Sequence, residues 1–136
     1  MKNITIFLIL LTITTQSLIA QTRIATDERM DGVWSNSKEK WEIVDQDSDS
    51  NTYFEFKDNF TFLTHKTKTI TSIYKLTLKN YNSEHNHYNF SAVSDSGNEY
   101  NMIVNYEKRT IRFIYKDNKE NMRLVQHHIK DLAYVD

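Results

Sequence analysis

The stretch EYNMIVNY, residues 99–106, carries large apolar or aromatic side chains at every second position, namely Tyr100, Met102, Val104 and Tyr106. Glu99, Asn101 and Asn105 fall between them. Because successive side chains of a β-strand point to opposite faces, this spacing predicts a strand with one apolar and one polar face. One such strand cannot bury its apolar face alone, so the rest of the chain must supply partner strands.

The same period of two recurs through most of the chain beyond residue 40. It is seen at Trp41 and Ile43, at Phe54 and Phe56, at Phe60 and Phe62 beyond a tight Asp58–Asn59 turn, at Ile70, Tyr74, Leu76 and Leu78, at Tyr88, Phe90 and Ala92, at Ile111, Phe113 and Tyr115, and at Met122 and Leu124. The intervening segments are short and polar, and no segment carries a sustained helical stripe. Neighbours in sequence are therefore expected to pair as antiparallel strands.

One-sided burial decides how such a meander must close. The faces opposite the apolar ones are rich in Thr, Lys and Asn, so only one side of the sheet is expected to be buried. An open meander of about eight or nine strands would leave that side in water, so it must roll into a barrel or fold over as a sandwich. The short connections favour an all-β up-and-down barrel, with a β-sandwich as the alternative.

The chain begins MKNITIFLILLTITTQSLIA, in which Lys2 precedes an apolar run over residues 4–13 and Ala20 ends the segment. This layout is typical of a secretory signal peptide, so we expect residues 1–20 to be cleaved and the protein to be periplasmic or secreted. A retained anchor is the alternative, although a membrane span needs about 18 or more apolar residues. Beyond it we expect a flexible lead-in at 21–31, a barrel domain at 32–128 and a C-terminal tail at 129–136.

Composition excludes several classes of function. The net charge of −1 provides no field that would attract nucleic acid. The chain has no Cys, and neither a Gly-x-Ser-x-Gly motif nor a glycine-rich phosphate loop, so acyl transfer and nucleotide chemistry have no support. We therefore predict no catalytic residue and no cofactor, and we do not expect an enzyme.

Gly32-Val33-Trp34 opens the first candidate strand with Gly-x-Trp, and Arg123 lies in the last one. A Gly-x-Trp at the start of a small exported meander resembles the lipocalins and their wider calycin relatives, and is similar to small lipocalin-like exported proteins of Bacteroidetes-type bacteria. The resemblance implies an eight-stranded barrel in which Trp34 plugs one end and Arg123 packs across its ring. Its other short motifs and its usual cysteines are not in this chain. The alternative is that Gly32 makes a turn and Trp34 belongs to the core.

Three aspartates alternate in VDQDSDS, at Asp45, Asp47 and Asp49. Three carboxylates on one loop could bind a calcium ion, but an EF-hand would need Gly at the sixth position and Glu at the twelfth, where this chain has Ser50 and Phe56. We interpret the stretch first as a hairpin loop whose Asp side chains bond their own backbone, and only second as a calcium site.

His85 and His87 are two residues apart and would point to the same side of an extended segment, as two ligands of a zinc or copper ion do. They lie, however, in a polar stretch where surface histidines are ordinary. We therefore predict no metal site and keep these two residues, like the aspartates, only as weak candidates.

An interior rich in aromatic side chains leaves two functions open. The leading one is a non-enzymatic binding protein that takes a small apolar or amphipathic ligand at a barrel mouth. The residues predicted to contact the ligand are Trp34, Phe54, Tyr74, Tyr88, Tyr100, Tyr106, Phe113 and Arg123. The alternative is a protein-interaction module with a filled core, such as an envelope inhibitor, an immunity-type protein or an accessory subunit. Ile73, Ile103 and Ile114, on the parity opposite the core, would then form its exposed patch.

Overall fold

The computed structural model describes residues 22–134, apart from the side chains of residues 49, 50 and 134. The described chain forms eight strands: β1 (Thr22–Ser35), β2 (Lys40–Lys57), β3 (Phe62–Lys66), β4 (Thr71–Asn82), β5 (His87–Ser94), β6 (Glu99–Asn105), β7 (Thr110–Lys116) and β8 (Met122–Tyr134). The predicted signal peptide, residues 1–20, lies outside the described residues.

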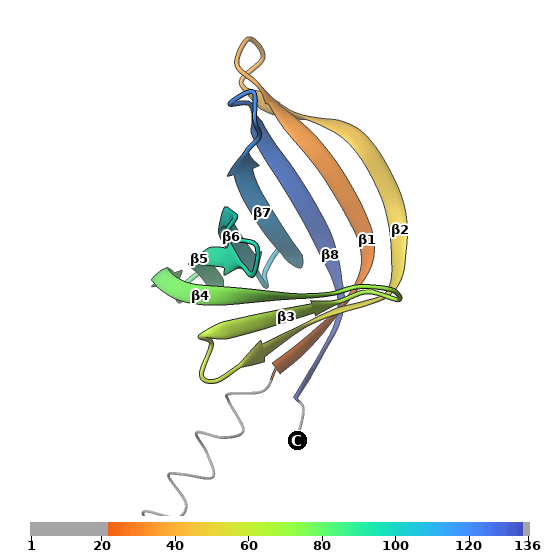
Figure 1. Cartoon of the computed structure of the whole chain (residues 1–136), viewed down its shortest axis with the longest axis vertical. Coiled ribbons are helices and arrows are strands. Elements are labelled where there is room, and N and C mark those ends of the chain that lie inside the picture. The colour runs from red at the N-terminus through yellow and green to blue at the C-terminus, as the bar shows by residue number, and fades with distance from the viewer. Residues whose placement is uncertain (1–21, 135–136) are drawn as a thin grey trace, which may run out of the picture.

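The strands form a closed barrel in sequence order, in which every strand pairs with its neighbours and β1 closes the ring against β8 (Figure 1). All pairings are antiparallel. The predicted up-and-down barrel is therefore confirmed, and the sandwich alternative is wrong. The β1–β2 hairpin projects beyond the other strands at the top of the view (Figure 1).

Most of the hairpin turns contain residues whose φ is positive, a conformation that costs a side chain little only in Gly, Asn and Asp. Gly97 turns β5 into β6 with φ 88°, and Asn86 turns β4 into β5 with φ 46°. The β2–β3 turn places three such residues in a row, Asp58, Asn59 and Phe60. Because Phe60 is part of this turn, the following strand starts at Phe62, two positions later than predicted.

The core fills the middle of the barrel with the alternate side chains of all eight strands. Its fully or nearly fully buried members are Ile24, Phe54, Phe56, Leu63, Leu76, Phe90, Ala92, Met102, Val104, Ile111, Phe113 and Ile129. The parity predicted for residues 99–106 is confirmed, because Met102 and Val104 are 0% exposed while Tyr100 and Tyr106 pack against the core from its two ends. Burying this much apolar surface is the main force that stabilises a disulfide-free domain of this size.

The structure corrects the predicted domain boundaries. Residues 22–31, expected to be a flexible lead-in, form most of β1 and pair with both β2 and β8. Residues 129–134, expected to be a tail, continue β8 against β1. The apolar alternation is weak in both segments, so sequence alone underestimated them, yet Ile24 and Ile129 both belong to the core.

The parity prediction is wrong at four exposed residues. Phe62 is exposed because the longer β2–β3 turn gives its inward place to Leu63. Ile43, Ile70 and Leu78 are each about half exposed or more. Ile70 lies in the β3–β4 turn, and Leu78 lies beside a register shift in β4.

Ile43 belongs to a row of outward-facing residues that runs across four strands. Ile43 pairs with Gly32, Gly32 with Leu124, and Leu124 with Ile114. A Cβ at Gly32 would lie 3.6 Å from the Ile43 side chain and 3.7 Å from that of Leu124. The bare glycine thus leaves room for these two side chains, which explains why Leu124 is only 2% exposed although it faces away from the core. The prediction that Leu124 faces the core is wrong, since Val125, His127 and Ile129 take the inner positions of β8.

Candidate functional site

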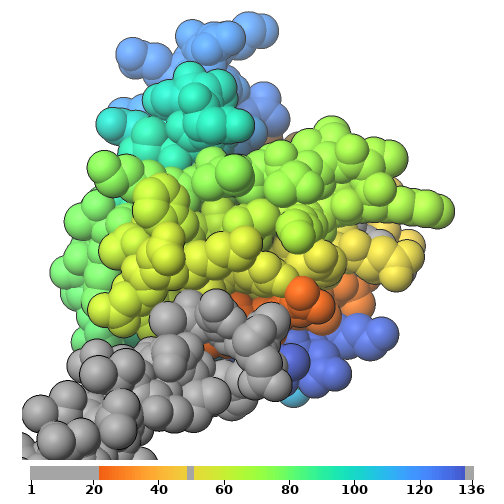
Figure 2. Space-filling model, turned by 60° about the horizontal axis from the view of Figure 1, so that its bottom comes forward, coloured from red at the N-terminus to blue at the C-terminus, as the bar shows by residue number. Residues whose placement is uncertain are grey.

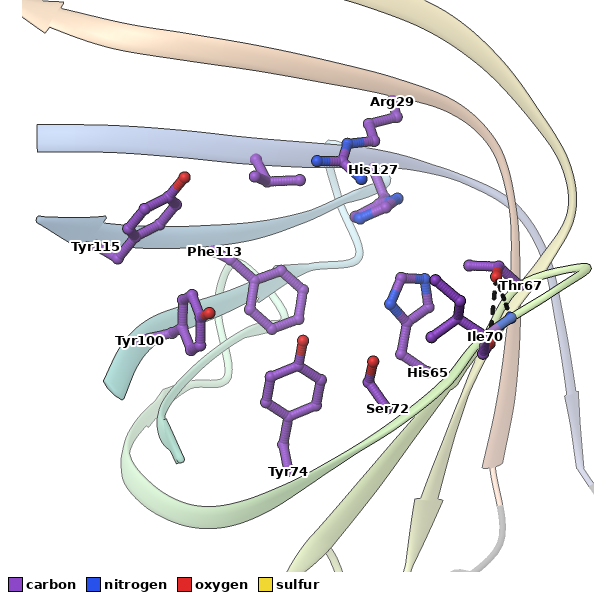
Figure 3. Close-up of a pocket in the computed structure, with 11 residues that line it drawn as sticks. Arg29, His65, Thr67, Ile70, Ser72, Tyr74, Tyr100, Phe113, Tyr115 and His127 are labelled. Atoms are coloured by element: carbon purple, nitrogen blue, oxygen red, sulfur yellow. Dashed lines mark hydrogen bonds between the residues drawn. The ribbon is translucent and has the colours of Figure 1, made fainter. Parts of the chain in front are cut away.

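A cavity of about 350 Å³ opens at the end of the barrel that carries the β3–β4 turn. It is lined by Arg29, His65, Thr67, Ile70, Ser72, Tyr74, Tyr100, Phe113, Tyr115, Val125 and His127 (Figure 3). These residues come from β1, β3, the β3–β4 turn, β4, β6, β7 and β8, so the closure of the barrel brings them together. We call this space the mouth cavity.

Two histidines and a phenylalanine form the floor of the mouth cavity. The ring of Phe54, which is 0% exposed, stacks on His65 with centroids 4.1 Å apart and planes 11° apart. His127 meets Phe54 edge to face at 5.1 Å and His65 at 5.3 Å. Strand register explains the cluster, because His65 is the cross-strand partner of Phe54 and His127 is the partner of Arg29. This layer, which includes the core residue Phe54, closes the mouth cavity toward the core.

Four rings form one wall of the mouth cavity. Tyr74 and Tyr100 meet edge to face at 5.8 Å, and Phe113 lies 5.6 Å from Tyr74 and 6.0 Å from Tyr100. Tyr115 extends the wall with an edge-to-face contact to Tyr100 at 5.4 Å. Figure 3 shows the hydroxyl group of Tyr74 directed into the cavity beside the ring of Phe113. The wall is therefore apolar over most of its area and carries a few hydrogen-bonding groups.

Arg29 provides the cationic side of the mouth cavity. Its Nε and Nη2 atoms donate to Oδ1 of Asp31 at 3.2 and 3.1 Å, and its side chain is 45% exposed. The eleven lining residues include no Asp or Glu. Arg29 lies above His127 at the top of Figure 3, across the cavity from Tyr74.

The Tyr74 phenol stays protonated at neutral pH. Burial is the main cause that raises its pKa above the ordinary value of 10.0, and the charges of Tyr100 and Asp95 act in the same direction. The nearby Arg29 charge and a hydrogen bond with Ser72 lower the pKa by less. Tyr74 therefore offers an O–H donor to any group in the cavity.

The β3–β4 turn forms one rim of the mouth cavity and is held by local hydrogen bonds. The Ile70 N–H donates to the Thr67 hydroxyl at 3.0 Å, and the Thr67 N–H donates to the Ile70 carbonyl at 2.8 Å. Ile70 is 63% exposed at this rim. An exposed isoleucine beside the opening is an apolar contact for whatever enters.

The structure brings together part of the predicted ligand-binding set. Tyr74, Tyr100 and Phe113 line the mouth cavity, and Phe54 supports its floor from below. Tyr88 and Tyr106 lie at the opposite end of the barrel, where their rings meet edge to face at 5.8 Å. Core residues lie between these two tyrosines and the cavity, so the structure does not bring them together with the other predicted ligand-binding residues.

Trp34 and Arg123 lie on opposite faces of the sheet, which excludes the stacking implied by the lipocalin resemblance. Arg29 faces inward, so Trp34, five residues further along β1, faces outward, where it meets Trp41 edge to face at 5.3 Å. Arg123 shares the inward parity of Val125, and its Nε donates to Asp117 at 2.9 Å. Neither residue lines the mouth cavity.

The weak metal candidates fall in two separate segments of the chain, β2 and the β4–β5 turn with the start of β5. Asp45 and Asp47 are exposed in the middle of β2, which corrects the prediction of a hairpin loop there, while the side chain of Asp49 lies outside the described residues. His85 lies in the β4–β5 turn with its Nδ1 3.2 Å from Glu107, and His87 begins β5. Within the described part of the chain, no group of three or more His, Asp or Glu side chains is placed to hold a metal ion.

The ligand-binding set predicted from sequence left out Arg29, His65 and His127. Arg29 fell in the supposed lead-in, and His127 is one of two adjacent histidines that face opposite sides of β8. A signal existed for His65, which shares the parity of buried Leu63 in β3. Placing all three at one mouth required the register of the closing β1–β8 pair, which no local pattern specifies.

A second recess of about 430 Å³ lies beside the β2–β3 turn and β4. These segments belong to the part of the chain coloured yellow to green in Figure 2. It is lined by Asn59, Phe60, Thr61, Leu76, Thr77, Leu78, Tyr88 and Phe90. No charged side chain is among these residues, and half of them are exposed surface residues. The mouth cavity is the stronger candidate, since it combines an apolar wall with several converging polar groups.

No family model, curated protein or solved structure matches the chain. Among residues 22–134, no helix has the length and apolar character that a membrane crossing requires.

Proposed function

We propose that this protein is a non-enzymatic binding protein that takes a small amphipathic ligand in the mouth cavity. The observation that carries the proposal is a cavity of about 350 Å³ with an aromatic wall, Arg29 at its rim and imidazole and hydroxyl groups facing inward. Ligand sites are concave, mostly apolar and supplied with a few converging polar groups.

The size of the mouth cavity limits the ligand. A volume of about 350 Å³ lies near the lower end of the roughly 300–1,000 Å³ found for small-molecule sites. It corresponds to about a dozen water molecules at roughly 30 Å³ each. The stacked layer of Phe54, His65 and His127 prevents a long chain from passing deeper. The ligand is therefore compact.

Filling the mouth cavity should abolish binding without unfolding the barrel. Ser72 is half-buried and faces the cavity, so Ser72→Phe should place a ring in the ligand's space. Thr71→Phe is the matched control, since Thr71 is the adjacent residue of β4 and is exposed on the other face. Calorimetric titration with small aromatic and aliphatic probes should show binding to wild type and Thr71→Phe but not to Ser72→Phe. Equal binding by all three proteins, or no binding by any, would refute the proposal.

We also propose that the protein works in the periplasm or outside the cell. The support is the sequence of residues 1–20 with its basic start, apolar run and small final residue. The mass of the mature protein from an envelope fraction checks this, with Gln21 expected as the first residue. A mature chain that retains residues 1–20 would contradict it.

An interaction with an envelope protein is the second candidate. The observation that favours it is the exposed apolar surface of the projecting hairpin, where Ile43 is 48% and Val44 60% exposed beside Trp34 and Trp41. Contiguous exposed apolar residues commonly mark protein contacts. A pull-down from envelope extract should recover a specific partner with wild type and lose it with Ile43→Lys. Recovery of no partner, or equal recovery by the variant, counts against this candidate.

A further inference from the structure

We infer that the mouth cavity selects small aromatic monocarboxylates and that Arg29 binds their carboxylate group. The inference rests on the proposed function, because it names the class of ligand for the same cavity. Three observations support it: the charge of the lining, the geometry of Arg29 and the arrangement of the rings.

The lining of the mouth cavity favours an anion. One guanidinium, two imidazoles and several hydroxyl groups face the cavity, and no carboxylate is among the eleven lining residues. Protonated Tyr74 adds an O–H donor on the opposite wall. A ligand with an acceptor-rich negative end can therefore be bonded from two sides, whereas a cationic ligand would meet Arg29 without a carboxylate partner in the lining.

Arg29 has the donors that a carboxylate requires. A guanidinium carries five N–H donors in a planar fork, and Arg29 directs two of them to a single oxygen of Asp31. The other three donors are left to contact a ligand. The Asp31 contact also fixes the orientation of the guanidinium, which lowers the entropy lost when a ligand binds. The positive charge of Arg29 lowers the pKa of Tyr74 on the opposite wall, so its electric field extends across the cavity.

A single negative charge fits better than two. Arg29 is the one guanidinium in the lining, and Asp31 already balances part of its charge. A dianion such as a phosphate monoester would bring a second charge for which the cavity supplies no second guanidinium or ammonium group. Giving up the hydration of that charge would oppose binding.

The rings of the wall favour a planar aromatic body. Tyr74, Tyr100 and Phe113 stand at centroid distances of 5.6–6.0 Å from one another and present both faces and edges. Aromatic rings prefer offset-stacked or edge-to-face contacts at such distances. A flexible aliphatic acid of equal volume would lose more rotational freedom on binding and would gain no ring contacts.

The test compares two probes of nearly the same shape, one anionic and one neutral: naphthalene carboxylate and the corresponding carboxamide. Calorimetric titration at pH 7 should show that wild type binds the carboxylate about tenfold more tightly or better, because a charge-assisted hydrogen bond is stronger than a neutral one. Arg29→Gln should bring the ratio of the two affinities close to one, chiefly by weakening the binding of the carboxylate. Arg112→Gln is the matched control, since Arg112 lies on the outer face of β7, where its Nε donates to Gln126 at 2.7 Å.

The outcomes separate this inference from the proposed function. Equal binding of the two probes by wild type, in the mouth cavity, would overturn the anion selectivity and leave the cavity as a binding site. Binding of neither probe nor of any other small ligand would overturn both. Selectivity that survives in Arg29→Gln, or that is lost in Arg112→Gln, would show that a surface charge and not Arg29 attracts the anion.

Discussion

Asp117 and Arg123 show at the scale of single residues how side chains fix the rim of the barrel. Asp117 accepts hydrogen bonds from Arg123 Nε and from the backbone N–H groups of Lys119 and Asn121, each at 2.9 Å. These bonds hold the β7–β8 turn and occupy Arg123. The resemblance to lipocalins gave Arg123 a tryptophan partner, but a carboxylate six residues away on the same hairpin is the partner that the fold provides.

The hydrogen bond from Arg123 is the main cause that lowers the pKa of Asp117, followed by the backbone bond from Asn121. Carbon-detected NMR titration should therefore place the pKa of Asp117 below the ordinary Asp value of about 3.9. In Arg123→Gln it should rise toward that value, and in Arg112→Gln it should not change. Because the pKa is lowered in the folded state, the stability from this pair is present above the unfolded pKa and is lost as pH falls through the folded one. An Asp117 pKa unaffected by Arg123→Gln would contradict the assignment.

The alternation of inward and outward side chains is the feature of a strand that is easiest to predict from sequence, and β6 shows it over its whole length. Met102 is 0% exposed inside the barrel, whereas Ile103 is half-buried on the outer face. Met102→Ala should lower the free energy of unfolding by about 2–5 kcal/mol. Ile103→Ala should cost clearly less, about 1 kcal/mol, because only part of its side chain leaves a packed environment. Denaturant unfolding of both variants checks this, and a larger loss for Ile103→Ala would mean that the parity of β6 is inverted.

The first strand tests whether residues 22–31 belong to the barrel. Ile24 is 0% exposed and pairs with Phe54 on β2 and Leu132 on β8. Ile24→Ala should therefore cost about 2–5 kcal/mol of unfolding free energy. The outward neighbour Ala25 serves as control, and Ala25→Ser should change stability by about 0.5 kcal/mol or less. A negligible effect of Ile24→Ala would restore the flexible lead-in expected from sequence.

Prediction from sequence succeeded for features that a local pattern determines. It failed for features that depend on the register between neighbouring strands. The period of two at Met102 and Val104 was enough to predict a one-sided strand, and short turns were enough to predict a meander. The position of Phe60 inside a turn shifted Phe62 outward, because one residue of slip exchanges the two faces of a strand. The prediction for Leu124 failed for a different reason. Leu124 faces outward but is buried there, because Gly32 has no side chain to occupy the space beside it.

At the scale of the whole molecule, closure of β1 against β8 creates the candidate site. Arg29 and His127 are partners across that closing pair, yet they are almost a hundred residues apart in sequence. Sequence could predict that many aromatic side chains face inward, but not which of them surround empty space. Tyr74 and Tyr100 line the mouth cavity, whereas Tyr88 and Tyr106 pack at the other end, although all four follow the same alternation. The packed core lies between the two ends of the barrel, so only the tyrosines at one end reach the mouth cavity.

The division into a filled core and one binding mouth can be measured by NMR on protein with labelled tyrosine rings, titrated with naphthalene carboxylate. The ring signals of Tyr74, Tyr100 and Tyr115 should shift in proportion to ligand bound, because these rings line the cavity. Those of Tyr88 and Tyr106 should stay in place, because the core lies between them and the ligand. Shifts at Tyr88 and Tyr106, or saturation with probe without any change at Tyr74 and Tyr100, would contradict this division.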